Sequence, residues 1–176
     1  MTATAQEKKI DELYGLIESI EVAMFTTRRP DGRLVSRPMA TQERNPIADL
    51  WFVTDIHSDK LDELEHDPHI NASYYNLKSR EFVSVSGSAQ ISTDRAKIRE
   101  LYKPDWKIWF GKLDDVRDGG PDDPRLALIL VDADSVTYLK QDRPKPVILF
   151  EVAKTLVTGG TPELGEVKQV QFDEGR

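Results

Sequence analysis

The segment from Thr54 to Lys60 carries the residue types best suited to binding an anion. Thr54 ends an apolar run, and Ser58 and Lys60 follow it where a helix is expected to begin. The start of a helix presents backbone N–H groups without helical partners and the positive end of the helix dipole. With a hydroxyl and an ammonium group added, this segment could hold a phosphate. In the alternative, which the local pattern alone favours, Ser58 only caps the helix and Lys60 is a solvated charge.

Arg37 is the second residue that could bind an anion. Side chains alternate between the two faces of a strand, so Arg37 shares a face with Val35 and Met39, whereas Ser36 and Pro38 share the other. A cation among apolar neighbours can serve an anionic ligand. It can equally extend to solvent or pair with a carboxylate, and the isolated pattern favours those alternatives.

Three aromatic residues lie close together further along the chain, at Trp106, Trp109 and Phe110. Aromatic side chains in such a group could stack on a planar ring or fill a subunit interface. Packing in a core or an interface is the simpler interpretation.

Several other chemistries lack support in the sequence. There is no cysteine, which excludes disulfides, thiolate metal sites and cysteine nucleophiles. His57, His66 and His69 are not expected to share a metal, because Asp67-Pro68 breaks the helix between the last two. The acidic residues between 114 and 123 lack the order of a calcium loop and predict a hydrated loop. Nucleophile-elbow, dinucleotide-binding and phosphate-loop motifs are also absent.

Length and charge narrow the class of protein. The 176 residues, 20.0 kDa in mass, are enough for one domain. With 24 Lys and Arg against 31 Asp and Glu, the net charge of −7 disfavours a nucleic-acid partner. The longest apolar run, 126–131, is too short for a membrane span, and the first residues lack the pattern of a signal peptide. A cytoplasmic location is therefore expected.

The elements that must position these residues are mostly short strands. Apolar residues at three- and four-residue steps predict an amphipathic helix over 10–20. Pro38 places its strand at an edge or a bulge, and Gly87 suggests a bulge in another strand. Strands are expected at 22–27, 34–39, 50–54, 70–75 and 82–91, and further helices at 59–66 and 94–102.

The rest of the chain is less regular. Residues 104–125 predict a long irregular loop, and 126–131 and 136–139 predict two closing strands joined by a polar turn. A last helix is expected over 146–157, and 161–176 predict a loose polar tail after a single domain over 1–160. Six or seven short strands with a few helices predict a mainly β (α+β) fold, a small antiparallel Greek-key barrel. A doubly wound parallel sheet is excluded.

Between about Asp11 and Leu139, five motifs follow one another in a specific order. They are 24–27, 31–39, 50–54 with Ser58-Asp59-Lys60, 83–89, and Trp109-Phe110. This series resembles the bacterial general stress protein family, within the pyridoxamine 5′-phosphate oxidase-like group of FMN-binding split barrels. The resemblance implies a six-stranded split barrel that forms a homodimer, with one FMN at each end of the subunit interface.

The resemblance also implies which residues bind the flavin. The ring and the ribityl chain would lie against the second predicted strand, at Ser36, Arg37, Pro38 and Met39. The phosphate would be held at Thr54, Ser58 and Lys60, the segment that the local pattern indicates independently. An aromatic segment would approach the flavin from the partner chain, through Trp106, Trp109 and Phe110.

The resemblance leaves more than one function open. The first hypothesis is a flavin-binding general stress protein that uses FMN, or FAD in its place. Pyridoxamine phosphate oxidases carry additional basic residues for their phosphates, and no second basic set is found in this sequence, so that activity is not expected. One alternative is an FMN-dependent oxidoreductase that passes hydride from a nicotinamide cofactor to a small acceptor. The other is a split barrel that binds haem or a deazaflavin.

Overall fold

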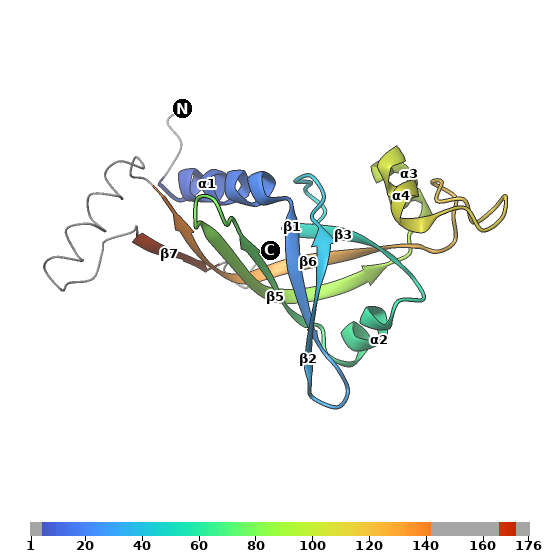
Figure 1. Cartoon of the computed structure of the whole chain (residues 1–176), viewed down its shortest axis with the longest axis horizontal. Coiled ribbons are helices and arrows are strands. Elements are labelled where there is room, and N and C mark those ends of the chain that lie inside the picture. Colours follow the sequence, from blue (N-terminus) through green and yellow to red (C-terminus); the bar gives the residue numbers. More distant parts are fainter. Residues whose placement is uncertain (1–4, 142–165, 172–176) are drawn as a thin grey trace, which may run out of the picture.

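Antiparallel strands are the main secondary structure of the computed structural model, which describes residues 5–141 and 166–171 (Figure 1). The first half of the chain contains α1 (Ala5–Ile20), β1 (Val22–Arg28), β2 (Leu34–Ala40), β3 (Leu50–Asp55), α2 (Asp59–His66) and β4 (His69–Tyr75). The second half contains β5 (Phe82–Ser92), α3 (Arg95–Leu101), η1 (Pro104–Trp106), α4 (Lys107–Phe110), β6 (Leu126–Lys140) and β7 (Glu166–Gln171). None of the described helices is long and apolar enough to cross a membrane.

The strands follow the order β2-β1-β4-β5-β6-β3, and β7 adds to the far end of β6. One half of the long strand β6 pairs with β3 and the other half pairs with β7. The two ends of the order, β2 and β3, approach each other where the backbone N–H of Gln42 donates to the carbonyl of Trp51 at 3.1 Å. This is the split-barrel α+β fold predicted from the sequence. Pro38 lies on the edge strand β2, opposite Met24 of β1, as its missing N–H requires.

Two hydrophobic clusters explain why β3 is apolar on both faces. Leu50 and Phe52 point into the main core, which fills the barrel. Trp51 and Val53 point the other way, into a second cluster against α3 and η1. A strand buried on both faces reads as a continuous apolar run, which is how it was predicted. Helix α1 packs its apolar stripe, Leu13, Leu16 and Ile17, onto the main core.

The predicted bulge at Gly87 is present. Ser86 pairs with Ser135 but Gly87 pairs with Ala133, so Asp134 is the extra residue of β6. A Cβ atom at position 87 would lie 2.1 Å from the carbonyl oxygen of Asp132. Only glycine lets the two strands approach this closely here.

Three of the predicted boundaries are wrong. Residues 126–140 form one strand, because Asp132 and Asp134 point to solvent while Ala133 between them is buried. The polar residues around Ala133 are typical of a turn, but here they are the solvent-facing positions of a strand. Residues 104–110 form two short helical segments, and residues 166–171 of the predicted loose tail form a strand on β6. The predicted helix over 146–157 lies outside the described residues.

Candidate functional site

Three of the residues predicted to bind an anion meet where β3 leads into α2. The Lys60 ammonium donates to Thr54 Oγ1 at 2.8 Å and to Ser58 Oγ at 2.5 Å. Thr54 is the buried next-to-last residue of β3, and Ser58 precedes the first turn of α2. The chain thereby joins two hydroxyl groups, one ammonium group and a helix start, the donor types that phosphate needs.

The geometry at Ser58 and Lys60 differs from the alternative in which Ser58 only caps the helix and Lys60 is a solvated charge. Ser58 occupies the N-cap position, but its side chain makes no capping hydrogen bond and accepts from Lys60 instead. Lys60 is half-buried rather than solvated. Burial lowers its pKa, the neighbouring charge of Arg37 lowers it further, and Asp55, Glu63 and Asp59 act in the opposite direction.

Arg37 reaches the same region from β2 and forms the ion pair that the sequence left open. It points inward from the edge strand, donates to the hydroxyl of Thr27, and donates to Glu63 Oε2 at 2.6 Å. Thr27 donates to that same carboxylate oxygen at 2.5 Å. The site therefore combines β1, β2, the end of β3 and α2.

Glu63 and Thr27 are residues that the sequence analysis missed. Glu63 is 6% exposed and lies on the buried side of α2. Burial acts to raise its pKa, but the hydrogen bonds from Thr27 and Arg37, with the Arg37 charge, outweigh burial and hold the pKa below its usual value. The sequence contains one indication of this role: Glu63 lies between Leu61 and Leu64 on the apolar side of a short helix, where an acidic residue needs a partner.

The other predicted residues of β2 do not join this cluster. Ser36 and Pro38 are exposed on the opposite face of the strand, where Ser36 Oγ shares a 2.7 Å hydrogen bond with Thr26 Oγ1. Met39 is buried in the main core. Within one chain, Arg37 is thus the residue of 36–39 that lies beside Lys60.

The three aromatic residues have different environments. Trp106 is 2% exposed, packs edge-on against Trp51 and Tyr102, and donates to Gln42 Oε1 at 3.1 Å. It is a core residue, and a ligand could reach it only if this cluster opened. Trp109, by contrast, is 78% exposed. Phe110 is partly buried beneath the guanidinium of Arg125.

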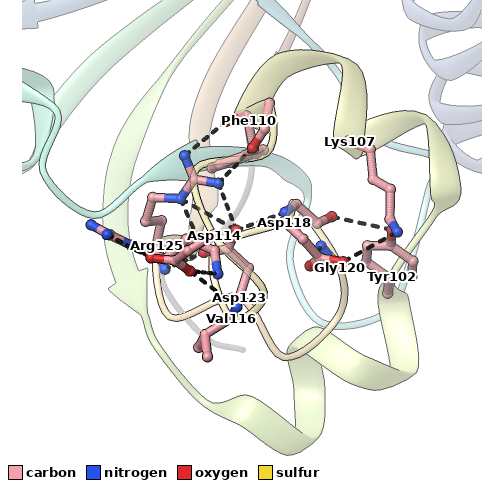
Figure 2. Close-up of polar contacts among 12 residues, drawn as sticks. Tyr102, Lys107, Phe110, Asp114, Val116, Asp118, Gly120, Asp123 and Arg125 are labelled. Atoms are coloured by element: carbon pink, nitrogen blue, oxygen red, sulfur yellow. Dashed lines mark hydrogen bonds and ion pairs between the residues drawn. The ribbon is translucent and has the colours of Figure 1, made fainter.

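The acidic segment after Phe110 is a loop, as predicted, and one of its acidic residues, Asp123, is buried. Figure 2 shows its centre, where the buried Arg125 side chain donates to Asp123 and to the carbonyls of Phe110 and Gly111. Asp114 accepts from the backbone of Val116 and Arg117, which ties the tip of the loop. The Arg125 contacts hold the C-terminal end of α4, the short helix that carries Trp109.

The histidines do not gather into a metal site. His69 Nδ1 lies 2.7 Å from Asp67 Oδ1, and both flank the turn between α2 and β4. Over the described ranges, 5–141 and 166–171, no group of three or more metal-binding side chains is found.

The chain thus combines a split barrel with a cationic site at the start of α2. A sequence model described as "Pyridoxamine 5'-phosphate oxidase like" matches residues 8–163, and the chain belongs to that family. Protein bli-3 from Neurospora crassa is 37% identical over 177 residues, covering 98% of this chain and 84% of that protein.

Solved structures agree with the family. One, from Jannaschia sp. CCS1 and provisionally named general stress protein 26, has 25% identity and a TM-score of 0.69, covering 94% of this chain and 99% of that one. Another is the general stress FMN/FAD binding protein of Xanthomonas citri. It has 26% identity and a TM-score of 0.59, covering 74% of this chain and 88% of that one.

Proposed function

We propose that the chain is a flavin-binding general stress protein that holds FMN, with FAD as the alternative ligand. The observation that carries the proposal is the convergence of Lys60, Ser58 and Thr54, with Arg37 beside them. These groups suit a phosphate dianion, because charge-assisted hydrogen bonds from several elements meet in one place. The flavin-binding relative from Xanthomonas citri supports the choice of ligand.

When bound, the flavin would supply the hydride and electron chemistry. The residues of the chain would bind and orient it. Lys60 and Arg37 would neutralise the phosphate, the hydroxyls of Ser58 and Thr54 would donate hydrogen bonds to its oxygens, and the edge strand β2 would face the rest of the cofactor. Pyridoxamine phosphate oxidase activity is not part of the proposal.

A titration of the purified protein with FMN, FAD, riboflavin and pyridoxal phosphate tests this function. Flavin absorption and fluorescence report the binding. We expect FMN to bind at least about tenfold more tightly than riboflavin, because riboflavin lacks the phosphate that Lys60 and Ser58 would hold. Equal affinities for the two flavins, or no flavin binding, would contradict the proposal.

We further propose that two copies form a homodimer across the open face of the sheet. Cross-strand pairing places ten outward-facing residues in two continuous rows on β1, β2, β4, β5 and β6. All ten are uncharged: Pro38, Met24, Ser73, Ser84 and Thr137 in one row, and Ser36, Thr26, Asn71, Ser86 and Ser135 in the other. A surface depleted of charge in this way is typical of an interface core. The exposed Trp109 and the adjacent Phe110 of one copy would then approach the flavin of the other.

Light scattering after size exclusion tests the dimer. The wild-type protein should have about twice the 20.0 kDa mass of one chain. Ser73→Arg, which buries an unpaired charge at the centre of the face, should give a monomer with weakened flavin binding. Thr93→Arg, at an exposed position beyond β5, is the matched control and should stay dimeric. A monomeric wild type, or a dimeric Ser73→Arg protein, would argue against this interface.

A further inference from the structure

We infer that Glu63 is a positioning residue, whose carboxylate fixes the Arg37 guanidinium at the phosphate end of the cofactor site. The inference rests on the proposed function for the identity of the ligand. It adds a role for a buried acid that would otherwise only repel an anion.

The Arg37 side chain points toward the inside of the barrel and needs a partner there. This side chain lies on the inward face of β2, the face that carries the buried Met39. A cation on such a face is costly unless it is paired, and without a partner an arginine side chain extends to water. Glu63, presented by α2 at 6% exposure, provides that partner at 2.6 Å.

Two hydrogen bonds from separate nitrogens hold the Arg37 guanidinium in place. Its Nη1 donates to Thr27 and its Nη2 donates to Glu63, while Thr27 donates to the same Glu63 oxygen. One carboxylate oxygen thus joins β1, β2 and α2 in a closed triangle of hydrogen bonds. Because two separate nitrogens are engaged, the plane of the guanidinium is fixed as well as its position. The two bonds use only part of the five N–H donors of an arginine, so others remain for a ligand.

The Glu63 carboxylate has two opposing effects on the binding of an anion at this site. A buried carboxylate beside an anion site weakens binding by repulsion and strengthens it by preorganising a donor. The geometry favours preorganisation, since Glu63 contacts Arg37 directly and is itself buried. Substitutions that separate the acceptor from the charge can therefore distinguish the two effects.

The experiment compares Glu63→Met, which keeps the volume but removes the acceptor, with Glu63→Gln, which keeps an acceptor oxygen without the charge. For Glu63→Met we expect FMN affinity to fall about tenfold to hundredfold and riboflavin affinity to change less than about threefold. Glu63→Gln should restore FMN affinity to within about threefold of wild type, because its amide oxygen can accept from both Arg37 and Thr27. Glu65→Met, at an exposed position of the same helix, is the control.

Each other outcome overturns the inference in a recognisable way. Tighter FMN binding by both Glu63 variants would show that repulsion dominates. Parallel losses for FMN and riboflavin, with a lowered thermal midpoint, would show a purely structural role. Failure of the proposed function would look different, because the wild-type protein would then not distinguish FMN from riboflavin at all.

Discussion

Replacing Ser58 and Lys60 together by alanine is expected to lower FMN affinity by about 300-fold while leaving riboflavin affinity within about threefold of wild type. The two side chains touch each other, and both lie at the start of α2. Losing hydrogen bonds from one ammonium and one hydroxyl group to a phosphate removes about 3.5 kcal/mol of binding free energy, at roughly 1.4 kcal/mol per factor of ten. Riboflavin has no phosphate, so its binding should not register the change.

Fluorescence titration of both flavins against both proteins measures the effect. Lys78→Ala is the matched control for loss of a positive charge, because Lys78 is exposed in the turn between β4 and β5. Unfolding must be monitored in parallel, since the Lys60 ammonium also donates hydrogen bonds to Thr54 and Ser58 and so joins the end of β3 to the start of α2. An unchanged ratio of FMN to riboflavin affinity in the double variant would show that the phosphate binds elsewhere.

The sequence predicts half of this anion site because that half is local. Ser58 and Lys60 are two residues apart at a helix start, and such a spacing places both side chains without knowledge of the fold. The Arg37–Glu63 pair is different, because it joins residues 26 positions apart. Only the pairing of β1 with β2, and the packing of α2 beneath them, brings that arginine and that acid together.

The same limit explains the errors elsewhere. Residues 132–134 have the composition of a turn, and what makes them a strand is the neighbouring strand β5, to which Ala133 and Asp132 pair. Trp106 and Trp109 are the same residue type in the same short aromatic segment, yet Trp106 is buried and Trp109 is exposed. A pattern of residue types does not tell which aromatic side chain meets Trp51. Where the local sequence pattern is sufficient, the prediction is confirmed. Examples are the periodic apolar residues of α1 and the continuous apolar run of β3.

The buried ion pair between Asp123 and Arg125 is expected to contribute strongly to the stability of the fold. Asp123 is fully buried, and its carboxylate accepts from the backbone N–H of Gly119 at 2.7 Å and from Arg125 Nη2 at 2.7 Å. Asp123→Ala is expected to lower the free energy of unfolding by about 3 kcal/mol, because it leaves a buried positive charge without its partner. For a chain of this length, that corresponds to a fall of about 10 °C in the thermal midpoint. Asp122→Ala, which removes an exposed partner of Arg99, is the control and should change the midpoint little.

The pH dependence of this pair follows from its pKa. Burial acts to raise the pKa of Asp123, but hydrogen bonds from Arg125 and Gly119 outweigh it and hold the pKa below its ordinary 3.8. A carboxylate whose pKa is lower in the folded state stabilises the fold above the ordinary value, and the stabilisation is lost as pH falls through the folded value. The difference in stability between wild type and Asp123→Ala should therefore be constant from pH 5 to 7 and shrink below about pH 4. A difference that stays constant in acid would show that the variant fails for another reason, such as the cavity it leaves. Arg125 also donates to the carbonyls of Phe110 and Gly111 at the end of α4, so the loss should displace the neighbouring Trp109 and weaken the flavin binding that we propose for the dimer.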